Sequence, residues 1–316
     1  MHNLYLQSIC NKLYGISHSF TAIAEASIPK VAVITDGASG IGKGIAMKCG
    51  KEQFNAVIII DLNETNSNKA RQEFLALYPD TRLIIFIADT TKRENIVNIV
   101  DELKSKYGIK EITHLFNNAG IGLVKTNVFK DDKDNLSNLD RMMDINFWSH
   151  VYCTQLFLPF LTDHKSYIIN TASLAAILNG ESMYNITKHA MAAYSQTLIH
   201  EFKASGDDKY KDIQVLCLCP GFVATDIAKN GIEIIGSKDK EEIELAENIN
   251  KWIHDHGITT EECADKVFES IEKGDFWIFP HIQDAHYYAS IRYQSWITRK
   301  HDLKEFKENI RPNYGK

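Results

Sequence analysis

The feature that most constrains the fold is a glycine-rich turn directly after the first apolar run of the chain. The run covers Lys30–Thr35, and a helical pattern begins near Ile41. Glycines in a strand-to-helix turn let the backbone approach an anion, and the free N–H groups of the helix N-terminus attract a pyrophosphate. Many such turns need glycine for backbone reasons alone, so placement matters. The residues assigned to this site are Asp36, Gly37, Ser39, Gly40, Ile41 and Gly42.

Strand and helix patterns alternate along the rest of the chain. Short apolar runs typical of buried parallel strands lie at 55–61, 82–88, 113–116, 167–171, 213–218 and 276–280. Helical stretches lie at 65–77, 91–107, 136–161, 182–204, 239–256 and 260–273. This order predicts an α/β fold with a Rossmann-type doubly wound parallel sheet and a ligand crevice at the carboxyl ends of its strands. We expect one catalytic domain over 30–280, between an N-terminal extension, 1–29, and a C-terminal extension, 281–316.

Composition narrows the classes of protein that fit. The chain has 316 residues, of which 44% are hydrophobic, so one α/β domain can account for most of it. Its net charge of −6 and mixed signs provide no basic stripe, which argues against a nucleic-acid partner. The six cysteines lack Cys-x-x-Cys spacing, so we expect reduced, packed thiols and no metal site.

The sequence also bears on localisation. No window is apolar enough to span a bilayer, so we expect a soluble, cytoplasmic protein. Residues 1–29 hold one lysine, several Ser and Thr, and no acid before Glu25. That composition is weakly similar to an organelle transit peptide, so mitochondrial targeting is the alternative.

Asp61 closes the second apolar run, 19 residues after Gly42. A carboxylate at this place can accept both hydroxyls of a ribose and repels a 2′-phosphate, so the sequence favours NAD over NADP. Alternatively, Asp61 is a turn acid or a helix N-cap.

Tyr184 is the only one of 13 tyrosines followed by lysine at the fourth position, Lys188. Residues four apart share a helix face, so both side chains can reach one crevice. At about 4 Å and an effective dielectric of about 20, the ammonium favours phenolate by about 4 kcal/mol, or about 3 pKa units before desolvation. We therefore expect the pKa of Tyr184 to be lowered enough for general acid or base work. Taken alone, such a pair is also compatible with packing or coincidence.

Several motifs follow the turn in a fixed order. They are Asn117-Asn118-Ala119-Gly120, Asn146, Ser173, Tyr184 with Lys188, and Pro220–Thr225. As a set over about residues 30 to 280, they resemble the short-chain dehydrogenase/reductase family in its short single-domain branch. That family transfers a hydride between a nicotinamide cofactor and an alcohol or ketone.

The resemblance implies roles for the catalytic residues Asn146, Ser173, Tyr184 and Lys188. Tyr184 would be the general acid or base, and Ser173 would hold the substrate oxygen. Lys188 would also bind the nicotinamide ribose, and Asn146 would bend its helix and carry a water of the proton relay. Thr171 is the fallback for Ser173.

The resemblance also implies cofactor contacts, besides those of Tyr184 and Lys188. Asp89 would bond the adenine ring, and Asn118 would line the cofactor cleft. The amide of Val223 and the hydroxyl of Thr225 would face the carboxamide and the pyrophosphate. All four residues are also compatible with turn chemistry.

The sequence departs from the family in two places. Asp36 stands where the family has glycine after the threonine of the first strand, and Gly37 follows one place later. Aspartate tolerates left-handed dihedrals, so the turn can form, but we expect the carboxylate to weaken NAD binding by repelling the pyrophosphate. The 11 residues from Ser173 to Tyr184 are fewer than is usual in the family.

The sequence thus predicts an NAD-dependent oxidoreductase acting on a secondary alcohol or its ketone. Segments 122–135, 174–183 and 222–258 would wall the substrate pocket, and their apolar residues favour a lipid-like substrate. The alternatives are an epimerase or dehydratase on the same fold and an NAD-binding sensor without turnover. By resemblance, helices 136–161 and 182–204 would pair to form a homodimer or homotetramer.

Overall fold

The computed structural model describes residues 28–122, 133–178 and 182–299. Within these residues, seven parallel strands form one sheet in the order β3-β2-β1-β4-β5-β6-β7. The strands are β1 Val31–Thr35, β2 Ala56–Asp61, β3 Arg82–Ile87, β4 His114–Asn117, β5 Ser166–Thr171, β6 Ile213–Leu218 and β7 Trp277–Ile278. The order reverses between β1 and β4, so the predicted doubly wound Rossmann-type sheet is confirmed.

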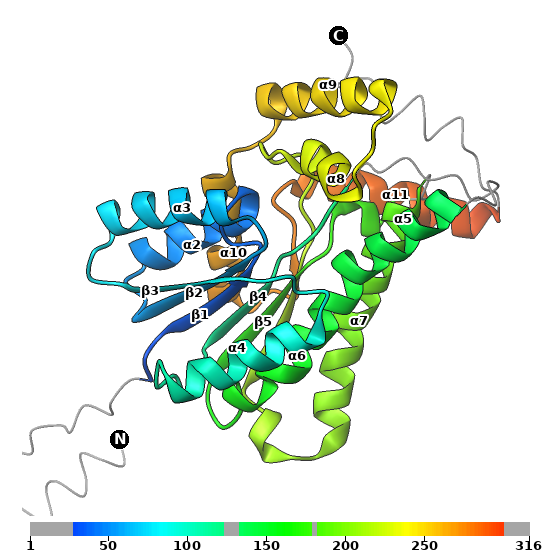
Figure 1. Cartoon of the computed structure of the whole chain (residues 1–316). Helices are drawn as coiled ribbons and strands as arrows, with labels where there is room; N and C mark the ends of the chain where they lie inside the picture. Colours follow the sequence, from blue (N-terminus) through cyan, green and yellow to red (C-terminus); the bar gives the residue numbers. More distant parts are fainter. Residues whose placement is uncertain (1–27, 123–132, 179–181, 300–316) are drawn as a thin grey trace, which may run out of the picture.

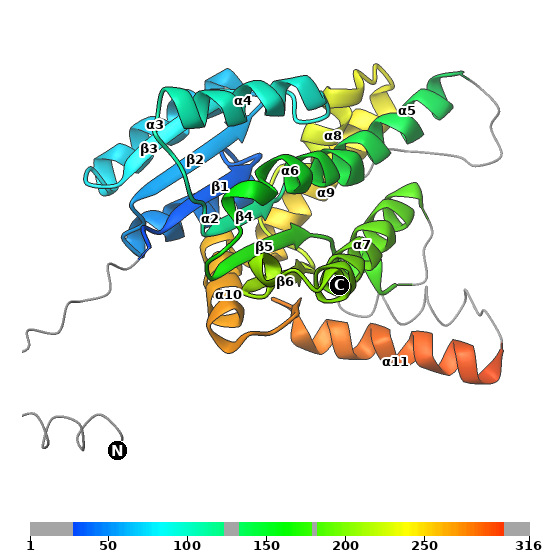
Figure 2. The ribbon, with the colours of Figure 1, turned by 90° about the horizontal axis from the view of Figure 1, so that it is seen from below.

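Helices cover both faces of this sheet (Figures 1 and 2). On one face lie α2 Gly40–Lys51, α3 Glu64–Leu77 and α10 Thr260–Lys273. On the other lie α4 Arg93–Ser105, α6 Ser149–Phe157 and α7 Met183–Ser205. Neighbouring residues of a strand point to opposite faces, so Ile34 packs toward α2 and Val33 toward α4. Both faces are buried, which explains why the strands are continuous apolar runs.

The predicted helix 136–161 is helical but not regular. It consists of α5 Lys133–Met143, a π-helical turn Asp144–Trp148, α6 and a short 3-10 turn Leu158–Phe160. Asn146 lies in the π turn and is fully buried. Such π turns widen the backbone locally and often occur at functional sites.

Two helices, α8 Ile227–Ile235 and α9 Lys240–His256, stand beyond the end of the sheet (Figure 1). The sequence patterns did not predict α8, because Gly231 interrupts a short apolar stretch and glycine disfavours helix. Glycine is required there, since a Cβ would lie 2.4 Å from the carbonyl oxygen of Gly122. This contact holds α8 against the segment that follows β4.

The C-terminal part forms the helix α11 Ile282–Thr298. Ala285 and Tyr288 pack against Leu174, from the short 3-10 turn Leu174–Ala176 after β5. Just before α11, the Nδ1 atom of His281 accepts a hydrogen bond of 3.1 Å from the N–H of Gly221. The C-terminal segment is thereby attached to the loop after β6.

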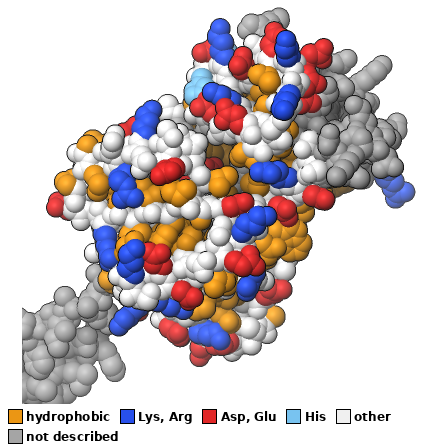
Figure 3. Space-filling model, viewed as in Figure 1, with side chains coloured by type: hydrophobic (Ala, Val, Ile, Leu, Met, Phe, Trp, Pro, Cys, Tyr) orange, Lys and Arg blue, Asp and Glu red, His pale blue; other side chains and the backbone are white. Residues whose placement is uncertain are grey.

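Acidic and basic side chains are interspersed over the face shown in Figure 3. The five described cysteines are buried free thiols, and the Sγ atoms of Cys217 and Cys219 lie 3.8 Å apart, as expected for one strand face. None of the described helices is both long and apolar enough to cross a membrane. Over the same residues, no cluster of His, Cys, Asp or Glu has the makings of a metal site.

Candidate active site

Two adjoining cavities lie along the carboxyl edge of the sheet, with volumes of about 580 and 540 Å³. Tyr184 and Lys188 line the larger cavity, and Asp61 and Asp89 line the smaller. Asp36 borders both. The glycine turn and the Tyr-Lys pair therefore share one cleft, although they are far apart in sequence.

The glycine turn has the shape needed to bind an anion. Asp36 adopts φ 52°, so it takes the left-handed conformation expected at this place, and Gly40 has φ 50°. A Cβ at Gly42 would lie 2.1 Å from the carbonyl oxygen of Asp36, so the turn closes only with glycine there. At Gly37 a Cβ would lie 3.0 Å from the side chain of Ile59.

The N-terminus of α2 opens into the larger cavity. Ser39 is its N-cap, but the serine side chain makes no capping hydrogen bond. Gly40 and Ile41 begin the helix and line the cavity. First-turn amide groups are therefore available to an anion.

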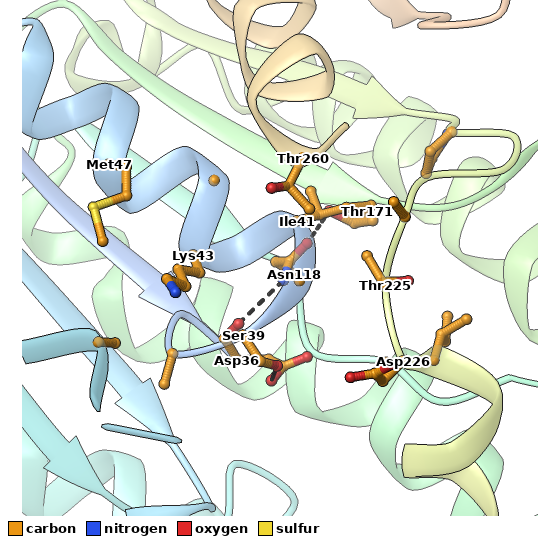
Figure 4. Close-up of a pocket in the computed structure, with 18 of the residues that line it drawn as sticks. Asp36, Ser39, Ile41, Lys43, Met47, Asn118, Thr171, Thr225, Asp226 and Thr260 are labelled. Atoms are coloured by element: carbon orange, nitrogen blue, oxygen red, sulfur yellow. Dashed lines mark hydrogen bonds between the residues drawn. The ribbon is translucent and has the colours of Figure 1, made fainter. Parts of the chain in front are cut away.

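Asn118 connects three strands beside this turn. Its N–H donates to Thr35 Oγ1 at 2.8 Å, and its Oδ1 accepts from Thr171 Oγ1 at 3.2 Å. Its Nδ2 lies 3.3 Å from the carbonyl oxygen of Thr35, and Figure 4 shows the side chain between the turn and β5. Asn118 thus fixes the cavity floor as well as lining it.

The two acids of the smaller cavity are held by backbone groups. Asp61 is 5% exposed, and its oxygens accept from the N–H groups of Ala38 at 2.9 Å and Asn63 at 2.8 Å. Asp89 accepts from the N–H of Thr91 at 2.9 Å and from its hydroxyl at 2.7 Å. Both carboxylates stabilise turns, and both also border the cavity.

The Asp36 carboxyl is directed toward Asp61. It hydrogen-bonds Asp61, and Ser39 Oγ donates to it at 3.4 Å. Burial, followed by the charge of Asp61, raises the pKa of Asp36 well above its usual value. In Figure 4, Asp36 and Ser39 lie across the cavity from Thr225 and Asp226.

Tyr184 and Lys188 project together from the first turns of α7 and line the larger cavity, and Ser173 is close enough to Tyr184 to act on its pKa. Lys188 is 2% exposed and donates to the carbonyl oxygen of Thr171 at 3.1 Å. Its Nζ lies 5.6 Å from the centroid of the Tyr184 ring. The structure thus brings together three of the four catalytic residues predicted from the sequence.

The expected lowering of the Tyr184 pKa is wrong for this arrangement. Burial raises the pKa of Tyr184, and the hydrogen bond with Ser173 opposes this only partly. Burial also lowers the pKa of Lys188 to about 8. The argument from sequence placed the ammonium beside the phenol oxygen, whereas here it bonds the backbone of β5.

Ser173 is better placed than its fallback, Thr171. Its Oγ accepts from the N–H of Ala175 at 3.1 Å, lies 3.4 Å from the carbonyl oxygen of Pro220, and contacts Tyr184. The Thr171 hydroxyl instead donates to Asn118. The short spacing between Ser173 and Tyr184 does not prevent their contact.

Asn146, the fourth predicted catalytic residue, anchors the segment after β4. Its Oδ1 accepts from the N–H of Ile121 at 2.8 Å, and its Nδ2 donates to the carbonyl oxygen of Ile121 at 2.9 Å. The same Nδ2 lies 3.1 Å from Thr187 Oγ1, next to Lys188 in α7. Asn146 therefore joins the π turn to the helix that carries Tyr184.

The two residues predicted in the loop after β6 differ in position. Val223 is buried in the core and forms a parallel bridge with Ile258. Thr225 lines the cavity opposite Gly40, whose Cβ would lie 3.2 Å from the threonine methyl group. The loop and the glycine turn therefore face each other across the cleft.

Two supporting residues escaped the sequence analysis. Thr35 Oγ1 accepts from the N–H groups of both Asn118 and Ala119, at 2.8 and 3.0 Å. His150 Nε2 lies 2.7 Å from the carbonyl oxygen of Ala119, and burial lowers the His150 pKa to about 3. The position of Thr35 at the end of the first strand could have indicated its role, whereas nothing in the sequence distinguishes His150 from an ordinary core histidine.

Comparison with known proteins agrees with this geometry. A family model described as short chain dehydrogenase matches residues 30–233. An 11-beta-hydroxysteroid dehydrogenase of Pinus massoniana is 30% identical over 255 residues, covering 79% of this chain and 67% of that protein. A CLA biosynthesis dehydrogenase/reductase of Lactiplantibacillus plantarum is 26% identical over 264 residues, covering 80% and 88%.

Solved structures share the fold. A short chain dehydrogenase/reductase from Burkholderia phymatum in complex with NAD superposes with a TM-score of 0.75 at 22% identity, covering 86% of this chain and 96% of that one. L-sorbose reductase from Gluconobacter frateurii, complexed with NADPH and L-sorbose, superposes with a TM-score of 0.61 at 23% identity, covering 79% of this chain and 94% of that one. With the family model matched over most of the sheet and its cleft, the chain belongs to the short chain dehydrogenase family.

Proposed function

We propose that this chain is an NAD-dependent oxidoreductase that interconverts a secondary alcohol and its ketone, with Tyr184 as general acid or base. The observation that carries the proposal is that Tyr184 and Lys188, with Ser173 beside Tyr184, line the cleft that begins at the uncapped N-terminus of α2. A proton carrier and an anion site would then share one cavity.

The residues present fit a nicotinamide dinucleotide. The free amide groups at the start of α2 would hold the pyrophosphate, and Asp61 would accept the hydroxyls of the adenosine ribose. Lys188 would bind the nicotinamide ribose, and a bound nicotinamide would supply or accept the hydride. Structural neighbours include NAD and NADPH complexes, so the proposed preference for NAD rests on the carboxylates of this chain.

The protonation of the site suits proton donation. Because the pKa of Tyr184 is raised, its phenol keeps its proton at neutral pH. It can therefore donate to the oxygen of a ketone as hydride arrives, while Ser173 holds that oxygen beside it. In the reverse direction the Tyr184 phenol must first release its proton to solvent, and the resulting phenolate then accepts the alcohol proton; the nearby Lys188 ammonium favours that phenolate below a pH of about 8.

The described part of the substrate pocket is partly apolar. Tyr184 packs in a cluster with Met183 and Ile235. Phe222, at 40% exposure, meets Trp252 edge to face at a centroid distance of 4.9 Å. These residues support a lipid-like substrate. Val124 and Phe129, two apolar residues of the predicted wall segment 122–135, lie outside the described residues.

A panel of secondary alcohols and ketones, with hydroxysteroids and hydroxy fatty acids included, tests the proposal. Each compound is incubated with NAD(H) or NADP(H), and the absorbance of the reduced nicotinamide is followed. We expect turnover with a lipid-like alcohol and a preference for NAD. Cofactor binding without hydride exchange across the panel would instead support a sensor, and a net isomerisation or dehydration at unchanged cofactor absorbance would support an epimerase or dehydratase.

We further propose a homodimer or homotetramer that pairs the helices around α6 and α7. Trp148 is 43% exposed and Ile186 is 52% exposed on these helices, which gives the pairing an apolar surface. Sedimentation equilibrium tests it, and Trp148→Glu should shift the protein toward monomer. A monomeric wild-type protein at micromolar concentration would contradict this proposal.

A further inference from the structure

The place where the chain departs from its family, Asp36, holds a second carboxyl beside Asp61. Asp36 directly follows β1, Asp61 is the last residue of the adjacent strand β2, and the Asp36 N–H donates to the carbonyl oxygen of Ile60 at 2.8 Å. Because Asp36 adopts φ 52°, its side chain turns toward Asp61 and hydrogen-bonds it. Both carboxyls border the smaller cavity.

Among the described residues, no ion pair joins either carboxyl to a cation. Lys43, in the second turn of α2, pairs with Glu73 of α3. Lys69 of α3 lines the larger cavity, and Lys188 bonds Thr171. Within the described residues, no ion pair therefore neutralises the negative charge of the two aspartates.

The remaining charged groups that line the cleft near Asp36 carry both signs. Asp89 after β3 bonds Thr91, and Asp226 before α8 accepts from His254 of α9 at 3.0 Å. The smaller cavity is also lined by Lys92, the N-cap of α4, by Asp140 and Arg141 of α5, by Asp144 of the π turn and by Glu233 of α8. None of them is hydrogen-bonded to the Asp36 carboxyl in the part of the chain that the structure describes.

Two carboxyls in contact, without a cation, hold one proton between them, because both cannot be ionised without strong repulsion. Asp61 already accepts from two backbone N–H groups, which favour its ionised form. The shared proton therefore resides on Asp36, which donates to Asp61. This agrees with the raised pKa of Asp36.

We propose that Asp36 and Asp61 form one carboxyl pair that recognises the unphosphorylated adenosine ribose of NAD and keeps a single negative charge there even when either residue is lost. This inference rests on the proposed function. In a variant without Asp61, Asp36 loses the like charge that adds to burial in raising its pKa, so its pKa falls and its ionised form becomes more stable. In a variant without Asp36, Asp61 stays ionised.

The pair makes Asp36 a specificity-determining residue that works together with Asp61. A single neutral substitution should leave one carboxylate to repel a 2′-phosphate, so it should open the site to NADP only slightly. The double substitution removes the charge. The effects of the two substitutions should therefore be strongly non-additive, as is expected of residues in one hydrogen-bonded network.

The pair also changes the expectation that Asp36 repels the pyrophosphate. Because Asp36 is neutral below its raised pKa and charged above it, the repulsion should be small below that pKa and should grow as pH rises through it. Asp36→Asn should therefore bind NAD much as the wild type does below that pKa and more tightly than the wild type above it.

The test compares wild type, Asp36→Asn, Asp61→Asn and the double variant by calorimetry with AMP and with adenosine 2′,5′-bisphosphate. These probes carry the adenosine ribose but do not reach Tyr184. We expect each single variant to change the ratio of the two dissociation constants by less than about 3-fold and the double variant by more than about 30-fold. If Asp61→Asn alone produced the full change, Asp36 would carry no charge and the proposal would be overturned.

Asp140→Asn is the matched control, because it removes a carboxylate from the same cavity but outside the pair. The ratio of the two dissociation constants should stay within about 3-fold of the wild-type ratio in this variant, and also when the substitution is combined with Asp61→Asn. If that combination changed the ratio as much as the Asp36→Asn, Asp61→Asn double variant does, the total charge of the cavity would explain the result, and the proposed pair would be contradicted.

A second measurement does not depend on how well the variants fold. In a ¹³C NMR titration of wild-type protein with labelled aspartate, two of the carboxyl signals should titrate as a coupled pair, one of them well above the ordinary range. If every aspartate titrated at or below its ordinary pKa, the pair would be disproved. Turnover of an alcohol is a separate measurement. If the two adenosine probes bind in the expected pattern but no alcohol is turned over, the pair is supported and the proposed function is contradicted. If an alcohol is turned over but the binding pattern is absent, the proposed function is supported and the pair is contradicted.

Discussion

The two ends of the cleft fix their polar groups by different physical means. At the Tyr184 end, donors meet acceptors: Lys188 bonds a carbonyl oxygen, and Asn146 uses both its oxygen and its nitrogen. At the other end, which we propose binds the ribose and call the ribose end, the carboxyls of Asp36 and Asp61 border one cavity, and the proposed pair shares a proton. Hydrogen-bond geometry therefore fixes the side chains at the Tyr184 end, whereas protonation fixes those at the ribose end. Activity at the Tyr184 end should fall when one group is removed. Ligand binding at the ribose end should change with pH and when both carboxyls are substituted.

The sharpest test of the Tyr184 end is Tyr184→Phe, with the largest expected effect. Turnover should fall about 100-fold or more because the proton carrier is lost, while NADH binding, measured by fluorescence titration, stays nearly unchanged. Tyr194→Phe is the control, because Tyr194 lies on the same helix and packs edge to face with Phe147, with ring centroids 5.8 Å apart. A Tyr184→Phe protein that kept more than about a tenth of wild-type turnover would remove Tyr184 from the proposed chemistry.

Gly42→Ala tests whether one turn supports both ends. The new Cβ would lie 2.1 Å from the Asp36 carbonyl oxygen and 2.7 Å from Asn118 Nδ2, so the turn must move. We expect a loss of about 1–3 kcal/mol in the free energy of unfolding, measured with denaturant, together with weaker binding of NADH and AMP alike. Gly108→Ala, at φ 68° with open space around it, should lower stability by about 1–2 kcal/mol and leave both ligands unaffected. Unchanged ligand binding in Gly42→Ala would show that the turn is not a shared support.

Lys188 makes the comparison quantitative through pH. With its pKa lowered to about 8 by burial, Lys188 loses its charge as pH rises through that value, well before an ordinary lysine would. NADH affinity should fall about tenfold between about pH 7 and pH 9 relative to AMP, since AMP does not reach Lys188 and cancels the contribution of the Asp36 pair. Lys188→Arg should flatten this relative profile because arginine stays charged. Were the wild-type profile already flat, Lys188 would not bind the cofactor through its charge.

The smallest expected effect separates structure from recognition at the ribose end. Asn63 caps α3 by accepting from the N–H of Asn66 at 2.9 Å, while its backbone N–H bonds Asp61. Asn63→Ala should lower the free energy of unfolding by about 1 kcal/mol, measured by chemical denaturation, and leave the NAD to NADP preference unchanged. A changed preference would mean that the α3 cap, and not only the carboxyl pair, determines which ribose is bound.

Most of the fold could be predicted from the sequence because both faces of the sheet are buried, which turns each strand into a continuous apolar run. The sequence failed where packing overrides local preference. Gly231 lies inside α8 only because of its contact with Gly122, and β7 is shorter than the apolar run that predicted it. Neither the close contact of Gly231 nor the length of β7 leaves a periodic pattern in the sequence.

The identity of the site residues could be predicted from motif order, but their charge states could not. The sequence showed that Lys188 follows Tyr184 by one helical turn, but not that its ammonium bonds Thr171. It showed Asp36 and Asp61 at the ends of two runs, but not that the left-handed backbone at Asp36 turns one carboxyl to the other. Charge state depends on burial and on such contacts, which only the folded chain provides.

The hydrogen bond from Gly221 to His281 gives the C-terminal helix a mechanical role. A donated N–H requires a lone pair on Nδ1, so the ring must be neutral with its proton on Nε2, and burial lowers the His281 pKa in keeping with this. The loop that carries Thr225 is therefore tethered from a point 60 residues later in the chain, beyond the segment that the family model matches. At a pH low enough to protonate His281, the hydrogen bond from Gly221 would be lost. The loop that forms one wall of the cleft would then become more mobile, while the sheet would stay intact.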